Sequence, residues 1–305
     1  MLRRTLLASA GAMALTGAAL AADLPSRAPP PVFLPPPPVF SWTGLYVGLN
    51  GGGTWSSSNT VETTAVPVFA APTFAAELAL SSSLATTSVP VSNSGFIGGG
   101  QTGYNYQFGN SFVAGIEADI QGIAGSIGKG AVFGSGVPVG FPAETITSAV
   151  GANRRIDYIG TVRGRLGFTI TPTFLAYGTG GLAYGGVNSR VAIFQQDVVA
   201  PVSNFNAPYS SFGSLSNSRV GWTAGGGLEW LFAPNWSVKV EYLYYDLGTA
   251  TFALSPLTNT FTSRRGGVAW SSSPFAKTRF NGNIVRAGLN YHFNLWGPAP
   301  VVAKY

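Results

Sequence analysis

The pattern of hydrophobic and polar positions is clearest near the end of the chain, in residues 283–293. Apolar or aromatic residues occupy alternate positions from Val285 to Phe293, and Arg286 and His292 are among the polar residues between them. Because successive side chains of a β-strand point to opposite faces, this period of two predicts a strand with one apolar and one polar face. We interpret the apolar face as facing lipid and the polar face as lining a closed barrel.

Similar segments recur along the chain, and short connections alternate with long ones. The short connections, Gly109-Asn110, Thr171-Pro172 and residues 233–235, consist of turn formers. The predicted fold is all-β, an eight-stranded antiparallel transmembrane β-barrel with long extracellular loops and both termini in the periplasm. The expected strands are residues 43–53, 95–108, 111–126, 155–170, 173–187, 219–232, 236–247 and 280–293, and the expected loops are 54–94, 127–154, 188–218 and 248–279.

The alternation assigns the charges of the mature chain to the inner face, the tails or the loops, and leaves none for the lipid face. A lysine or arginine in the middle of that face would cost about 2–4 kcal/mol. Eight strands enclose a space just wide enough for side chains, so we predict that the inner charges pair and plug the lumen. The predicted network is Glu117, Asp119, Asp157, Arg163, Arg165, Glu229, Lys239, Glu241 and Arg286.

Aromatic residues near the strand ends are expected to form girdles at the two membrane interfaces. Packing of the same rings in a core is the alternative. The expected girdle residues are Trp42, Tyr46, Tyr106, Phe108, Phe168, Trp230, Phe232, Trp236, Tyr291 and Phe293 at the periplasmic side, and Tyr244 and Tyr245 at the outer side.

Composition agrees with a barrel. Of the 305 residues 46% are hydrophobic and 9% charged, and 41 are glycine, which lets strands bend. Beyond residue 21 no apolar run reaches the roughly 20 residues of a membrane helix, so a closed barrel is the other way to span.

The N-terminus reads as an export signal, with Arg3 and Arg4, an apolar run and Ala19-Leu20-Ala21 as cleavage site. We predict a signal peptide (1–21), a proline-rich periplasmic leader (22–41), the barrel (42–293) and a periplasmic C-terminal extension (294–305). An uncleaved N-terminal anchor and a leader that binds a partner groove are the alternatives.

Catalysis and cofactor binding are not expected. Residues 98–103 satisfy G-x-G-x-x-G but lie in a predicted strand, so no helix N-terminus follows to receive a pyrophosphate. The chain has no cysteine and one histidine, which argues against thiolate or histidine metal sites. That histidine, His292, is expected inside the periplasmic end of the barrel, far from an outer rim where chemistry would take place. We predict no enzyme, no metal and no cofactor.

Basic residues outnumber acidic ones in the expected loops. Facing outward, they could pair with the phosphates of lipopolysaccharide, whereas a solvated surface without a fixed partner is the alternative. The expected contacts are Arg154, Arg155, Arg264 and Arg265. Nucleic acid is not an expected partner at this location.

Five short segments, read in order, carry a resemblance to a known family: residues 21–25, Trp42–Gly48, Gly178–Gly185, Gly221–Glu229 and the closing strand. Together they resemble the outer-membrane immunogenic or porin-like β-barrel family of alphaproteobacteria, relatives of the OmpA transmembrane domain. The resemblance covers the whole chain. It implies an outer-membrane surface protein with roles in envelope integrity and host recognition, and some relatives are reported as porins or haem binders.

In that family the closing strand usually ends the protein with an aromatic signal for the barrel-assembly machinery. Tyr291 and Phe293 occupy that place, but residues 294–305 follow them, so Tyr305 is an alternative signal.

We therefore predict a structural outer-membrane barrel protein that contributes to envelope integrity and surface interactions. Its expected partners are outer-membrane lipid, lipopolysaccharide and, during biogenesis, the assembly machinery. The alternatives are a narrow porin for small solutes or ions and a surface receptor or adhesin, for example for haem or a host ligand. The sequence leaves the oligomeric state open.

Overall fold

The computed structural model describes residues 41–109, 111–125, 127–199, 208–261 and 267–293. All of them belong to one compact unit, residues 39–305, distinct from residues 1–38. The predicted signal peptide, nearly all of the leader and the C-terminal extension lie outside the described residues. No helix in the described part of the chain is long and apolar enough to cross a membrane.

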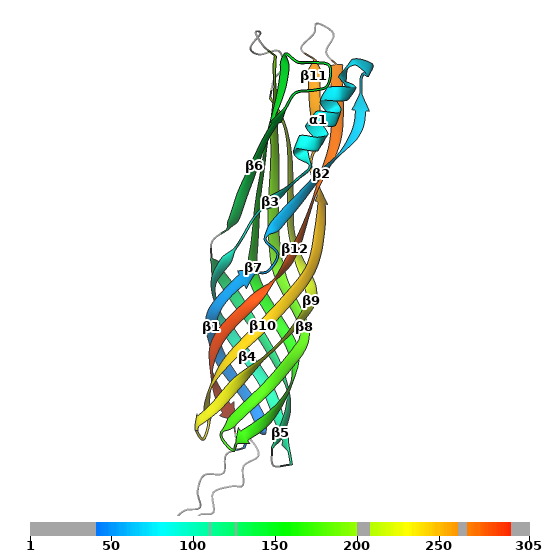
Figure 1. The fold of residues 1–305 in the computed structure, drawn as a ribbon. Helices are drawn as coiled ribbons and strands as arrows, with labels where there is room; N and C mark the ends of the chain where they lie inside the picture. Colours follow the sequence, from blue (N-terminus) through cyan, green and yellow to red (C-terminus); the bar gives the residue numbers. More distant parts are fainter. Residues whose placement is uncertain (1–40, 110, 126, 200–207, 262–266, 294–305) are drawn as a thin grey trace, which may run out of the picture. The chain divides into compact units, whose positions relative to one another are not determined.

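Eight antiparallel strands close into a ring (Figure 1). The order is β1-β4-β5-β7-β8-β9-β10-β12, and β12 returns to pair with β1 from Phe293↔Leu45 to Gly282↔Ser56. The predicted eight strands are confirmed, as are the tight connections after Phe108, Thr171 and Ala233. The ring strands are β1 (Gly44–Ser56), β4 (Ser94–Phe108), β5 (Phe112–Gly125), β7 (Glu144–Thr171), β8 (Phe174–Val199), β9 (Tyr209–Ala233), β10 (Trp236–Ala253) and β12 (Gly267–Phe293).

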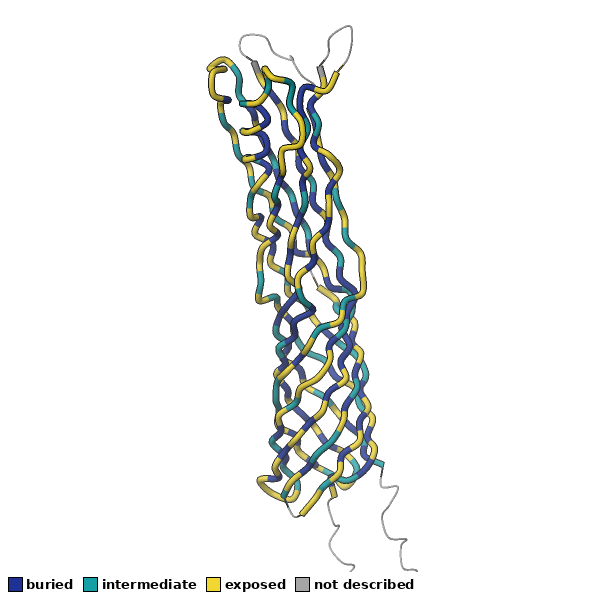
Figure 2. Tube along the Cα trace, turned by 90° about the vertical axis from the view of Figure 1, so that its right-hand side faces the viewer, coloured by how far each residue is buried: buried dark blue, intermediate teal, exposed yellow. Residues whose placement is uncertain are grey.

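The outer face of the ring is apolar. On β12, Val285 and Leu289 are 42% and 44% exposed, whereas Arg286 and Asn290, which directly follow them, are buried. The same alternation of exposed and buried positions runs along the other strands (Figure 2). Other exposed apolar residues of the ring are Val47, Leu49, Tyr106, Ile116, Ile120, Val162, Leu166, Leu182, Trp222, Leu228, Val238 and Val240.

The expected aromatic girdles are only partly present. Phe108, Trp230 and other rings near the turns are exposed on the outer face. Trp42, Tyr46 and Tyr245 are buried inside the ring instead, so their assignment to a girdle was wrong.

The expected long loops consist largely of strands, and this part of the sequence interpretation was wrong. Strands β7, β8, β9, β10 and β12 continue past the ring, and four more strands pair with them or with each other. We call this part, residues 60–90, 128–155, 188–199, 209–218, 249–261 and 267–279, the extension. Its further elements are β2 (Thr60–Ala70), η1 (Pro72–Phe74), α1 (Ala75–Ala85), β3 (Thr87–Pro90), β6 (Gly128–Gly136) and β11 (Leu257–Phe261).

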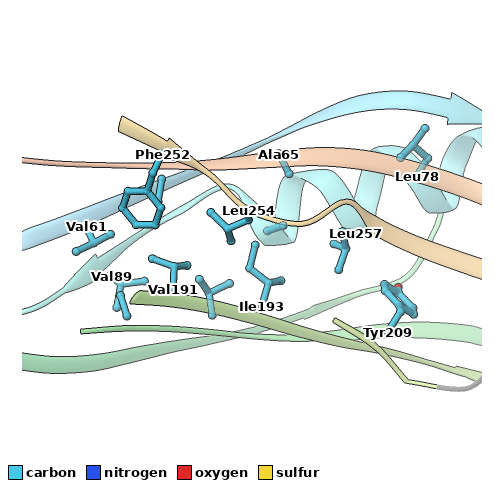
Figure 3. Close-up of a cluster of buried hydrophobic side chains, with 14 of the residues drawn as sticks. Val61, Ala65, Leu78, Val89, Val191, Ile193, Tyr209, Phe252, Leu254 and Leu257 are labelled. Carbon is cyan, nitrogen blue, oxygen red and sulfur yellow. The ribbon is translucent and has the colours of Figure 1, made fainter. Parts of the chain in front are cut away.

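An apolar core explains why these segments form strands. Alternate residues point inward, such as Val191 and Ile193 on β8 and Val61 and Ala65 on β2 (Figure 3). Fully burying one valine or isoleucine side chain contributes about 1.5–3 kcal/mol, so pairing these strands is worth far more than leaving them as loops. Trp270, also fully buried, packs edge-on against Tyr209 with ring centroids 5.0 Å apart.

Helix α1 runs along the side of the extension, beside β2, in the part farther from the ring (Figure 1). A helix of this length is marginal alone, so its stability comes from packing. Its Leu78 and Ala85 are buried, and Gln195 Nε2 donates to the Ser81 carbonyl oxygen at 2.9 Å and to Ser148 Oγ at 3.1 Å.

Three carboxyl groups influence one another electrostatically in this region, those of Glu77 on α1, Glu144 on β7 and Asp197 on β8. Burial, followed by the charges of Asp197 and Glu77, raises the pKa of Glu144 to about 7. Burial likewise raises the pKa of Glu77, with a smaller contribution from Asp197. The pKa of Glu144 therefore lies in the neutral range, where the other carboxyl groups of a protein are ordinarily ionised.

We predict that α1 is held more firmly at low pH. The pKa of the Glu144 carboxyl is higher in the folded chain than in the unfolded chain, where it is 4.5. Its contribution to the free energy of unfolding is therefore fully present below pH 4.5 and is lost as the pH rises through about 7. After correction for intrinsic rates, amide hydrogen exchange in α1 should therefore become faster between pH 5 and 7.5. Glu144→Gln should flatten this dependence, and an unchanged profile in that variant would contradict the assignment.

We also predict that the extension is a rigid, packed structure. Ile193→Ala should lower the free energy of unfolding by about 2–5 kcal/mol, because it leaves a cavity in the apolar core. The control Val68→Ala removes methyl groups that are 67% exposed and should change it by no more than about 0.5 kcal/mol. Urea titration of the refolded variants measures both changes in the free energy of unfolding. Equally small changes in Ile193→Ala and Val68→Ala would mean that the apolar core does not form.

Candidate functional site

The inner face of the ring holds a cluster of ionised side chains that we call the charge network. All are at most 5% exposed, and their formal charges balance at four positive and four negative. The members are Glu117, Asp119, Arg163, Arg165, Glu229, Lys239, Glu241 and Arg286.

Strand register places opposite charges side by side. Glu117 faces Arg163 across β5 and β7, Glu241 faces Arg286 across β10 and β12, and Glu229 faces Lys239. The closest distances within the first two pairs are 2.5 Å, from Arg163 Nη2 to Glu117 Oε1 and from Arg286 Nη2 to Glu241 Oε2. Charge-assisted hydrogen bonds of this length are the strong class.

Other pairs cross the lumen. Lys239 Nζ lies 2.8 and 2.7 Å from the two carboxylate oxygens of Glu117, although three strands separate β10 from β5 on either side of the ring. Arg163 Nη1 lies 2.9 Å from Glu241 Oε1, and Arg286 Nη2 lies 2.8 Å from Asp119 Oδ2. These contacts fill the middle of the ring.

Two tyrosines that sequence reasoning missed complete the network. Tyr46 Oη donates to Glu117 Oε2 at 2.6 Å, and Tyr177 Oη donates to Glu241 Oε1 at 3.1 Å. The Arg165 guanidinium lies 3.9 Å from the centre of the Tyr177 ring while its Nη2 contacts Glu229 at 2.6 Å. Both tyrosines lie on glycine-rich strands whose facing the residue pattern left unsettled.

Glycines directly opposite on the adjacent strands make room for these long side chains. A Cβ at Gly103 would lie 2.4 Å from Tyr46 Oη, and one at Gly288 would lie 3.2 Å from Lys239 Cε. Glycine therefore leaves room for long side chains inside the ring, in addition to letting the strands bend.

Apolar side chains are buried inside the ring on both sides of the charge network. Toward the turns lie Trp42, Val113, Leu175 and Leu231, and Trp42 Nε1 donates to the Pro172 carbonyl oxygen at 3.1 Å. Toward the extension lies a second buried cluster of Ile97, Ile156, Ile159, Ala183, Val187, Leu243, Tyr245, Leu247, Ala250, Phe280 and Ile284.

Asp157 was predicted in the network but lies outside it. A shift in register between Ile156 and Tyr158 places a bulge at this residue. Its carboxylate contacts Arg155 Nε at 2.6 Å and accepts from Asn188 Nδ2 at 2.5 Å. Without Asp157 the network has no net formal charge.

Arg154 was predicted to contact lipopolysaccharide, and this was wrong, since its side chain is 1% exposed. It donates to the carbonyl oxygens of Arg279 at 2.7 Å and Ser58 at 2.5 Å. Arg154 thus joins β7 to β12 at the base of the extension. Arg155 is exposed, and Arg264 and Arg265 lie outside the described residues.

The remaining candidates lie at the end of β12. The rings of Tyr291 and Phe293 are 5.1 Å apart, and Tyr291 packs against Trp236 at 5.1 Å. His292 is buried, with Nε2 2.8 Å from Ser237 Oγ and 3.6 Å from Glu229 Oε1. Within the described residues, no group of three or more histidine, aspartate or glutamate side chains is placed to hold a metal ion.

Comparison with known proteins agrees with this architecture. The family model of the outer membrane protein beta-barrel domain matches residues 7–293. The chain is 35% identical to the 31 kDa outer-membrane immunogenic protein of Brucella melitensis, over 96% of this chain and 100% of that one. It is 30% identical to the 22 kDa outer membrane protein of Rhizobium leguminosarum bv. viciae, over 51% of this chain and 58% of that one.

Among solved structures, the chain is similar to OprG of Pseudomonas aeruginosa, at 10% identity and a TM-score of 0.35, over 82% of this chain and 97% of that one. The family match and the Brucella relative carry the assignment. The chain belongs to the outer membrane protein beta-barrel family, and it is a protein of the outer membrane.

Proposed function

We propose that this protein is a closed structural barrel that spans the outer membrane, contributes to envelope integrity and carries a folded extension at the cell surface. The observation that supports this most directly is the ion pair between Lys239 and Glu117, which crosses the ring. A solute path along the ring axis would have to break it.

The distribution of exposed residues supports the placement. The ring presents an apolar outer face, whereas Glu62, Lys129, Arg155, Arg190 and Lys277 are exposed on the extension. An apolar band suits hydrocarbon and a charged wall suits water, so the ring is the membrane-spanning part and the extension lies outside it. The turns at the opposite end then face the periplasm.

The balance of charge in the lumen supports closure. Each acidic group is paired with at least one cation, so no unpaired charge remains in the network to attract an ion. Opening a path would separate buried pairs, and an uncompensated buried charge costs about 3–5 kcal/mol. A narrow porin would need other interactions to offset this loss of free energy when its path opens.

The aromatic residues at the end of β12 support a role in assembly. Tyr291 and Phe293 end the closing strand with their rings in contact, where the assembly machinery would meet them. We assign the assembly signal to this pair.

We predict that the refolded mature protein is electrically silent. In a planar bilayer it should give no unitary openings at neutral pH, under conditions in which a sixteen-stranded porin conducts, because side chains fill the lumen. Heat-modifiable gel mobility verifies folding of the same sample. Reproducible openings from the folded protein would favour the porin alternative.

We predict further that Arg163 stabilises the ring. Arg163→Met leaves Glu117, Asp119 and Glu241 with one cation fewer, and should lower the free energy of unfolding by about 3–5 kcal/mol. The control Lys277→Met removes an exposed charge and should have an effect below about 0.5 kcal/mol. Urea titration of both variants in the same lipid measures the two changes in the free energy of unfolding.

A paired variant separates charge balance from packing. Lys239→Met with Glu117→Gln removes one charge of each sign, so its cost should be clearly smaller than the sum of the two single costs. If the double variant lost as much free energy of unfolding as the two single variants together, the two charges would not be coupled.

A further inference from the structure

The outer wall of the extension contains an open hollow of about 890 Å³. Strands β6, β7, β8 and β9 form most of its lining. The residues that matter for its chemistry are Lys129, Gly151, Asn153, Arg190, Phe212 and Ser214.

Strand register explains how these residues gather. Lys129, Asn153, Arg190 and Ser214 form one continuous row across the four strands. Gly151, Ala192 and Phe212 form the next row on the same face, since every second residue points the same way.

The second row makes the wall hollow. Gly151 and Ala192 have little or no side chain, so they form a low floor beside Phe212, which is 52% exposed. Phe212 is supported by Phe194, whose ring lies edge-on at 5.2 Å. Above the floor stand the long side chains of the first row.

The two cations of the first row are available to a ligand. Within the described residues, neither Lys129 nor Arg190 forms an ion pair, whereas the nearby Arg155 is engaged by Asp157 at 2.6 Å. Both Lys129 and Arg190 are exposed. Both side chains can therefore pair with an anionic ligand without first breaking an ion pair within the described residues.

This combination matches an acidic sugar. Lysine and arginine pair with a phosphate or carboxylate, and Asn153 and Ser214 supply an amide and a hydroxyl for sugar hydroxyls. The apolar face of a sugar ring can pack on Phe212. A few convergent polar groups around an apolar floor are typical of a ligand site.

We propose that the hollow binds an acidic core sugar of the lipopolysaccharide that surrounds the protein. Arg190 lies eight residues beyond Leu182, a lipid-facing residue of β8 that is 60% exposed. At about 3.3 Å per residue this is roughly 25 Å along the strand, which places the row at the level of sugars attached to the outer leaflet. The hollow opens sideways, toward neighbouring lipid molecules.

This inference extends the proposed function from the lumen to the outer wall. It rests on the outer-membrane placement of the chain and on the extension lying outside the membrane, and does not depend on the closed lumen. A folded barrel that is electrically silent but does not bind the sugar would contradict only the binding site. A barrel that conducts ions and binds the sugar would contradict only the closed lumen.

The test is a binding titration with the full mature chain in nanodiscs of uncharged phospholipid. The probe is deacylated lipopolysaccharide inner-core oligosaccharide with its phosphates, and calorimetry measures its affinity. Lys129→Gln with Arg190→Gln should weaken binding about tenfold or more, given about 1 kcal/mol for each surface cation that meets an anionic headgroup.

A second variant fills the hollow without changing charge. A Cβ at Gly151 would meet only the Gly130 carbonyl oxygen, at 3.9 Å, so Gly151→Phe fits the strand and occupies the floor. It should weaken binding to a similar degree. Gel mobility shows whether each variant is folded.

The control removes one cation that lies away from the hollow and has no ion pair within the described residues. Lys277→Gln on β12 should change the affinity less than twofold, whereas Arg190→Gln, which also removes one exposed cation, should weaken binding about threefold or more. An equal loss in the control, or unchanged affinity in Gly151→Phe, would overturn the site. Binding of heparin but not of the core oligosaccharide would overturn its assignment to lipopolysaccharide, as would binding of inorganic phosphate with equal affinity.

Discussion

The ion pair between Lys239 on β10 and Glu117 on β5 is the contact on which the interior of the ring depends. It joins strands on opposite sides of the ring, at 2.7 and 2.8 Å, and Arg163 and Arg286 supply further contacts across the same space. Removing one partner of a buried ion pair costs about 3–5 kcal/mol, so each charge of the network depends on its partner. Glycines on the adjacent strands, such as Gly288 beside Lys239, give these long side chains the room they need.

The strands of the extension also alternate with a period of two, but they bury apolar residues instead of charged ones. The interior of the extension is apolar and its exterior carries charge, so the strands that leave the ring keep pairing for as long as alternate residues can be buried. Arg154 shows how the two parts join, since its guanidinium is buried and donates to backbone carbonyl oxygens of Arg279 and Ser58. The result is a wall of paired strands that carries exposed residues such as Lys129 and Arg190, rather than a set of separate loops.

Much of the ring could be predicted from the sequence, because lipid outside and charge inside make the alternation unambiguous. This is why Arg286 and Glu229 were placed correctly on the inner face, and why the tight turns were found. The extension was missed although Val191, Ile193 and Gln195 carry the same alternation, since its polar and charged residues resembled those of loops. Asp157 could not be placed because a bulge changes the parity at that residue, and Tyr46 because its strand is rich in glycine.

If charges that pair across the lumen fill it in the membrane, Lys239 and Glu117 stay in contact in a lipid bilayer. Solid-state nuclear magnetic resonance of the protein in bilayers, with ¹⁵N-labelled lysine and ¹³C-labelled glutamate, measures this contact. We expect a dipolar contact between the Lys239 amino nitrogen and the Glu117 carboxyl carbon, which is lost in Lys239→Met. A Lys239 amino group that shows no such contact and exchanges rapidly with water would mean that the lumen is open and solvated, and would rule out a filled lumen.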